Sequence, residues 1–115
     1  MLHRLEVQLV TALRRHLADG QPVHLPEAGR FLWRAFVELD ATRSMHMSGP
    51  NPIAYTEIEA WARLNRCPLG ARHVRIIKAM DATLIEHAAR KQGGDSIAGR
   101  SPHQLSAKLF DKAIG

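Results

Sequence analysis

The sequence predicts an all-α protein: a compact bundle of about four helices, followed by a short C-terminal helix on a glycine-rich linker. Two observations support this fold class. Apolar residues recur at helical spacing along several stretches, and no strand can be read in the chain. Hydrophobic residues also make up 45% of the 115 residues, which is enough for one domain with its own core. We therefore expect a helical domain at 1–91, a flexible linker at 92–100 and an amphipathic helix at 101–115.

The first two helices are predicted from leucine-rich stripes. The first spans residues 2–18, and Gly20 suits the left-handed position that follows a helix end. The second begins near Pro26, whose fixed φ suits a first helical turn, and it fades within residues 43–47. The residues on the inner stripe of the first helix are Leu2, Leu5, Leu9, Leu13 and Leu17. Those of the second are Ala28, Leu32, Ala35, Phe36 and Leu39, broadened by Trp33 and Val37.

A proline-braced loop precedes the third helix, expected at 56–64. Pro50 and Pro52 fix their own φ angles and bias the residues before them away from helix, while Gly49 permits unusual backbone geometry. Thr56 followed three residues later by Glu59 has the form of a capping box. Ile58, Trp61 and Ala62 are expected to share one face of this helix.

The longest regular pattern predicts a fourth helix at 71–91. Asp81 lies on or beside its apolar stripe, where an unpaired carboxylate would be costly to bury. We expect Asp81 to hold the preceding loop, with Lys78 or backbone N–H groups of residues 50–55 as partners. The stripe itself consists of Val74, Ile77, Met80, Leu84 and Ala88.

The C-terminal segment combines a glycine-rich stretch with a helix signal. Ser101 and Pro102 suit an N-cap and a first turn, and Leu105, Leu109 and Phe110 fall on one apolar side. A helix of this length is marginal alone in water, and it therefore needs another surface to pack against. Its own domain, another subunit and a partner's groove all remain open, and a homo-oligomer formed through this helix is one possibility.

The charge balance is basic, with a net charge of +5 and a pI near 10.1. Five cations and no carboxylate occur within residues 63–78. A solvated face, an acidic protein surface and nucleic acid all fit this pattern. The single cysteine, Cys67, excludes an internal disulfide and fits a reducing compartment.

No motif for catalysis or cofactor binding can be read. The seven histidines form no i, i+4 pair, and no phosphate-binding or nucleophile motif occurs, so we expect no enzyme activity, metal or cofactor. The chain begins without a leader pattern and has no stretch of roughly 20 apolar residues, which predicts a cytoplasmic protein.

An alternative function is DNA binding. The helix at 56–64, a turn and the basic helix at 71–91 have the order of a helix–turn–helix, with Arg72 and Arg75 near the start of the second helix. The turn at 65–70 is longer than the usual three or four residues.

A set of short motifs resembles one family. These are Gly49-Pro50-Asn51-Pro52-Ile53, then Glu57-Ile58-Glu59-Ala60-Trp61, Pro68-Leu69, Val74-Arg75 and Met80-Asp81, preceded by the aromatic helix around Trp33. Over roughly residues 28–85 the chain resembles the tail assembly chaperones of long-tailed bacteriophages and prophages.

This resemblance implies a non-enzymatic role in the host cytoplasm. Such chaperones bind the tape-measure protein, recruit tail-tube protein and are absent from the finished virion. The family's long helix is expected to open with a Pro-Trp-Glu-like start, where this chain has Gly70-Ala71-Arg72-His73. A proline and a carboxylate are therefore missing from the first turn, so either the helix start is shifted or the positive charge at that end serves a partner. The contact residues that we expect are Arg72, Arg75, Lys78, Leu105, Leu109 and Phe110.

Overall fold

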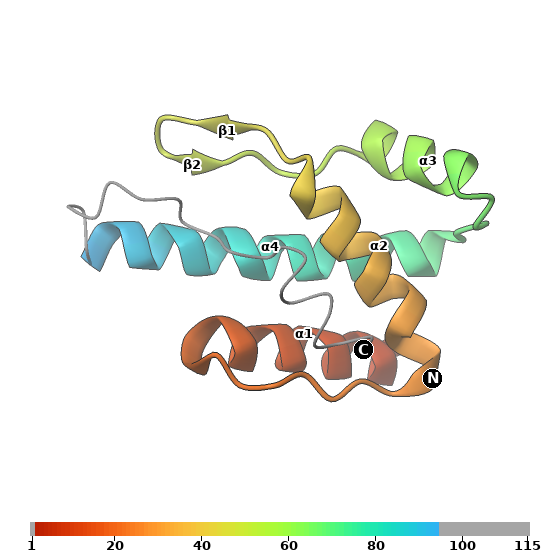
Figure 1. Ribbon diagram of the computed structural model, residues 1–115, viewed down its shortest axis with the longest axis horizontal. Coiled ribbons are helices and arrows are strands. Elements are labelled where there is room, and N and C mark those ends of the chain that lie inside the picture. The colour runs from red at the N-terminus through yellow and green to blue at the C-terminus, as the bar shows by residue number, and fades with distance from the viewer. Residues whose placement is uncertain (1, 95–115) are drawn as a thin grey trace.

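In a computed structural model of the chain, residues 2–94 are described, and they fold mainly as helices (Figure 1). The all-α prediction is confirmed, with one small addition, a hairpin of two-residue strands. Most of the predicted linker, residues 95–100, and the whole predicted C-terminal helix lie outside the described residues. The elements are α1 (Leu2–Asp19), the 3-10 turn η1 (Glu27–Gly29), α2 (Arg30–Ala41), β1 (Met45–His46), β2 (Gly49–Pro50), α3 (Tyr55–Leu64) and α4 (Ala71–Gly94).

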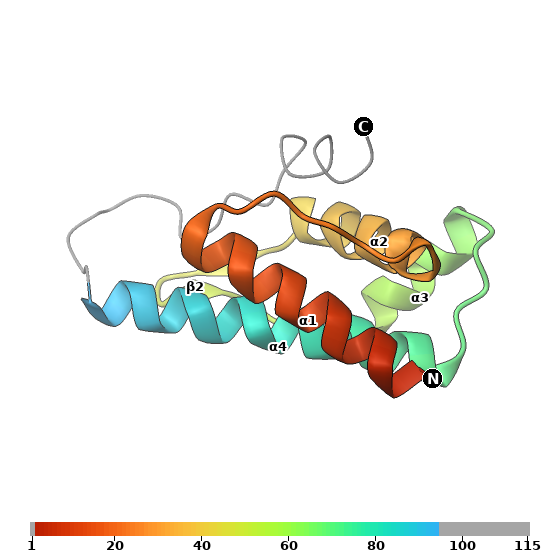
Figure 2. The ribbon, with the colours of Figure 1, turned by 90° about the horizontal axis from the view of Figure 1, so that it is seen from below.

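Helix α4 is the axis around which the other elements pack. It contacts α1 along one side, while α2 and β2 contact it elsewhere and α3 packs on α2 (Figure 1). Seen from below, α1 lies in front of the gap between α2 and α4 (Figure 2). In both views α1, α2 and α4 begin at the same end of the molecule. The positive ends of three helix dipoles therefore lie at that end.

Helix α1 packs through the predicted leucine stripe. Leu5, Leu9 and Leu13 are buried. Gly20 adopts a φ of 68° and donates its N–H to the carbonyl of His16 over 2.8 Å. Because this left-handed position carries almost no penalty for glycine, α1 ends at the predicted place.

Helix α2 is buried over most of its length, including both Trp33 and Asp40. Gly29, the last residue of η1 and the N-cap of α2, lies close to α1, and an added Cβ there would lie 3.0 Å from a methyl carbon of Leu9. The helix ends at Ala41, earlier than expected, and the chain turns into the hairpin. The prediction that no strand would occur is therefore wrong at this point, because the buried anchors described below hold the chain extended.

The capping box predicted from Thr56 and Glu59 is also wrong, because Ala54 rather than Thr56 is the N-cap of α3. Ala54 is the extended residue before α3, so the helix begins one residue ahead of Thr56. Glu57, rather than Glu59, reaches back to accept the Ala54 N–H over 2.7 Å. This is one half of a capping box, because alanine has no side-chain acceptor for the other half.

Helix α4 begins at Ala71 as predicted and extends through Gly94, beyond the predicted end at Lys91. Arg66, with a φ of 51°, takes a left-handed position in the turn that follows α3. Cys67 then donates its N–H to the carbonyl of Ala62 over 2.9 Å. The buried residues of α4 include the predicted Ile77, Met80, Leu84 and Ala88, together with Ile76.

Candidate functional site

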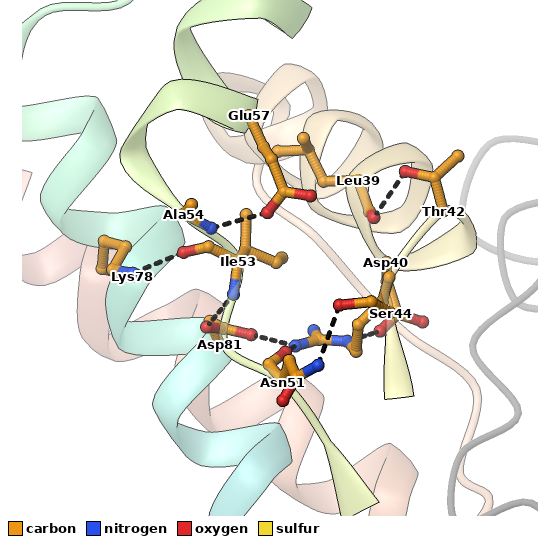
Figure 3. A network of polar contacts seen from close by, with 11 residues as sticks. Leu39, Asp40, Thr42, Ser44, Asn51, Ile53, Ala54, Glu57, Lys78 and Asp81 are labelled. Carbon is orange, nitrogen blue, oxygen red and sulfur yellow. Dashed lines mark hydrogen bonds and ion pairs between the residues drawn. The ribbon is translucent and has the colours of Figure 1, made fainter. Parts of the chain in front are cut away.

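A buried ionic network joins the end of α2, the hairpin and the middle of α4 (Figure 3). Arg43 Nε lies 2.8 Å from Asp40 Oδ1, and Arg43 Nη1 lies 2.6 Å from Asp81 Oδ1. The same Nη1 donates to the carbonyl of Asn51 over 2.8 Å. All three charged side chains are at most 3% exposed. One guanidinium therefore bridges two carboxylates and a loop carbonyl inside the protein.

The loop before α3 is held to α4 through its backbone. Asp81 Oδ2 accepts the N–H of Ile53 over 3.0 Å, and Lys78 Nζ donates to the Ile53 carbonyl over 2.5 Å (Figure 3). The Ile53 side chain itself is 2% exposed. Asp81 thus receives one of the loop N–H groups suggested for it, and Lys78 binds the loop rather than Asp81.

The hairpin adds short-range contacts to these anchors. Asn51 donates its backbone N–H to the Ser44 carbonyl and its side-chain amide to the Ser44 hydroxyl, over 3.0 and 2.9 Å. Gly49 is buried with a φ of 139°, a region that L side chains rarely adopt. Pro50 is buried beside it. Together these residues hold the Gly-Pro-Asn-Pro segment in one conformation.

This network is built as a scaffold. Burying a charge is costly unless it is paired, and here Arg43 pairs with both Asp40 and Asp81. Within residues 2–94, no three His, Cys, Asp or Glu side chains gather as a metal ion would require. The arrangement can fix a loop against a helix, and it places the loop beside the face of α4 that carries Lys78.

The remaining residues of the predicted motif lie around this scaffold. Pro52, Thr56 and Glu59 are exposed. Trp61 is half-buried, and its indole N–H donates to Glu38 Oε1 over 2.8 Å. This bond joins α3 to α2.

The predicted contact residues fall into two groups. Arg72 and Arg75 are exposed on the first turns of α4. Lys78 is half-buried, and besides bonding the loop it lies 4.7 Å from the ring centre of Tyr55. Such a cation–π contact stabilises by about 0.5–1 kcal/mol at exposed sites. Leu105, Leu109 and Phe110 lie outside the described residues.

The end of the molecule where three helices begin is basic. The first turns of α1, α2 and α4 contain no acidic residue, and the carboxylate of Glu27 lies in η1 just ahead of α2. Arg30 and Arg72 lie at the starts of α2 and α4, where a positive charge opposes the helix dipole. Phe31 and His73 link these two starts through an edge-to-face contact, with ring centres 5.2 Å apart. Cations and positive dipole ends therefore gather at this end.

The helices of the DNA-binding alternative are arranged differently from the predicted unit. Helix α3 packs against α2, and it joins α4 through the turn at 65–70 (Figure 1). A helix–turn–helix needs two successive helices that pack against each other, whereas α3 packs mainly against α2. Among the helices of residues 2–94, none is both long enough and apolar enough to cross a membrane.

Sequence reasoning missed Asp40 and Arg43, and it named Asn51 only as a member of the Gly-Pro-Asn-Pro motif. Asp40 follows Leu39 on the inner side of α2, so the argument that singled out Asp81 applies to it equally. Arg43, three residues after Asp40, is the nearest cation in sequence. No local signal pairs Arg43 with Asp81, because their contact depends on how α2 and α4 pack.

The family comparison agrees with the motifs that form this scaffold. The model of the family described as phage tail assembly chaperone matches residues 14–86, which include α2, the hairpin, α3 and most of α4. Comparisons with curated proteins and with solved structures give no significant match. Because the matched region covers more than half of the chain and contains the whole Asp40–Arg43–Asp81 network, the chain belongs to the phage tail assembly chaperone family.

Proposed function

We propose that this protein binds the tape-measure protein of its phage or prophage during tail assembly. It keeps the long helices of that protein soluble and recruits tail-tube protein, acting by binding and without catalysis. It works in the cytoplasm of the host cell and is absent from the finished virion. The observation that carries the proposal is membership of the tail assembly chaperone family over residues 14–86.

The basic end offers the first contact surface. Helix α4 begins at Ala71, so Arg72 does lie in its first turn, where its charge opposes the dipole. Within residues 2–94, neither Arg72 nor Arg75 has an ion-pair partner. Two unpaired, exposed guanidinium groups beside a positive dipole end suit carboxylates of a partner. The apolar side formed by Leu105, Leu109 and Phe110 is the second proposed contact surface.

Co-expression tests the proposed function directly. The chain is produced together with the tape-measure protein from its own gene neighbourhood, and an affinity tag on one asks whether the other co-purifies. We expect a complex and a larger soluble fraction of the tape-measure protein. The absence of both would refute the proposal, as would mass spectrometry that finds the chain in purified virions.

Charge reversal tests the contact surface. Arg72→Glu with Arg75→Glu should weaken co-purification, whereas Arg14→Glu with Arg15→Glu should leave it unchanged. The control pair makes the same change of charge on exposed residues of α1. Equal effects of both pairs would show that net charge alone matters. Tight duplex DNA binding with a steep salt dependence would instead favour the DNA-binding alternative.

A further inference from the structure

An open depression lies between the loop before α3 and the outward side of α4. It has a volume of about 500 Å³ and extends from Pro52 across α4 between Lys78 and Glu86. Pro52 and Ala82 are exposed, and Ile85 is only half-buried. The surface thus presents apolar groups beside the charges of Lys78 and Glu86.

The apolar surface continues toward the end of α4. Ala82, Ile85 and Ala89 follow one another at spacings of three and four residues, so they share a side of the helix. Both alanines are exposed, and small residues let a second helix approach closely. The stripe leads from the depression toward Gly94, where the described part of the chain ends.

We propose that, in the chain without its partner, the predicted helix at 101–115 docks in this depression, running antiparallel to α4. Leu105, Leu109 and Phe110 would face Ala82 and Ile85. The predicted helix needs such a surface, because a helix of this length is marginal alone in water. Tethering also favours the chain's own segment, since a short linker gives an effective concentration in the millimolar range.

The length of the connecting segment allows this return. From Gly94 back to Ile85, α4 covers about 14 Å at about 1.5 Å per residue. The six residues 95–100 can span at most about 20 Å. A helix that starts at Ser101 can therefore begin beside the last turns of α4 and pass the depression in its first half.

The antiparallel direction also suits the charges. It turns the negative dipole end of that helix toward the basic end of the molecule. Antiparallel docking therefore places the negative end of this helix dipole beside cations of the domain.

Disulfide trapping in the full chain tests this docking. In a Cys67→Ser background, Ala82→Cys is combined with Ser106→Cys, which lies on the same predicted side as Leu105 and Leu109. The control combines Ser106→Cys with Thr11→Cys, an exposed position on α1. At low micromolar protein concentration, we expect the intramolecular disulfide to form about tenfold faster in the Ala82 pair than in the Thr11 pair. This ratio corresponds to a segment that is docked about nine-tenths of the time.

Two outcomes would overturn the proposal. Equal rates for the two pairs would mean that the segment has no preference for the depression. Predominantly intermolecular disulfides would mean that the helix of a second copy of the chain occupies the depression. Adding Leu105→Asp should abolish the preference, whereas Ala107→Asp, on the opposite side of the predicted helix, should preserve it. The experiment uses the chain alone, so a negative result would leave tape-measure binding untouched.

Discussion

Arg43 Nη1 lies 2.6 Å from Asp81 Oδ1, and this buried ion pair fastens the segment that follows α2 to the middle of α4. The same guanidinium binds Asp40 and the Asn51 carbonyl, while Asp81 also accepts the Ile53 N–H. The hairpin and the start of α3 are therefore placed by charged side chains in addition to the burial of Ile53 and Ile58 in the core. This makes the position of the loop sensitive to single substitutions.

Replacing Arg43 with methionine should lower the free energy of unfolding by about 3–5 kcal/mol. The change keeps apolar volume, but it removes the buried cation that Asp40 and Asp81 share. Urea denaturation followed by circular dichroism measures the loss. Arg34→Met is the matched control, because the Arg34–Glu38 pair is exposed and such pairs contribute about 0–1 kcal/mol. Equal losses in both variants would contradict a structural role of the buried network.

Replacing Gly49 with alanine should cost about 1–3 kcal/mol, because its φ of 139° strains any residue with a Cβ. Thermal or urea unfolding measures the change. Gly70→Ala is the control: an added Cβ there would meet nothing closer than His73 Nδ1 at 4.0 Å, so only the weaker N-cap that alanine gives α4 should count, at about 0.5–1 kcal/mol. A neutral Gly49→Ala variant would show that the hairpin can relax.

The helices could be predicted from sequence because each buries a stripe with helical spacing. Leu5, Leu9 and Leu13 in α1, and Ile77, Met80 and Leu84 in α4, are buried as their spacing predicts. The starts of α1 and α4 and the glycine after α1 also follow local rules. These features depend on neighbours along the chain, and such neighbours are visible in the sequence.

The hairpin and the cap of α3 could not be predicted, because they depend on distant contacts. The position of Ala54 at the start of α3 depends on the ion pair between Arg43 and Asp81. It also depends on the hydrogen bonds that Ile53 makes with Asp81 and Lys78. The Thr56–Glu59 pattern is a valid local signal, but the tertiary anchors move the start by one residue. The candidate contact residues were identified by charge and periodicity alone, so they stay predictions.

His87 should titrate below its ordinary pKa of 6.5. Partial burial lowers the pKa of this imidazole first, and the nearby charges of Lys91 and Arg90 lower it further. Lys91→Gln should therefore raise the pKa of His87 without restoring it fully, which proton NMR of the imidazole can follow. An unchanged pKa in that variant would rule out the contribution of Lys91.

The same shift has a consequence for stability. The unfolded chain binds a proton at His87 more readily than the folded protein does, so stability falls as pH drops through 6.5. The contribution is complete above that pH, where both states hold a neutral imidazole. His87→Gln should accordingly flatten the loss of stability between pH 7 and pH 5. A steeper loss of stability in that variant would mean that folding raises the pKa of His87 rather than lowering it.

Deleting residues 101–115 should leave the helical domain folded. The core of the described residues is formed between Leu5 and Ala88, and its largest buried side chains, Trp33 and Phe36, belong to α2. Circular dichroism should retain the helical signal and one cooperative unfolding transition. If the deleted helix docks on Ala82 and Ile85 as proposed, its loss uncovers only that outer side of α4, and the urea midpoint should fall slightly. Global unfolding on deletion would instead show that the C-terminal segment supplies part of the core.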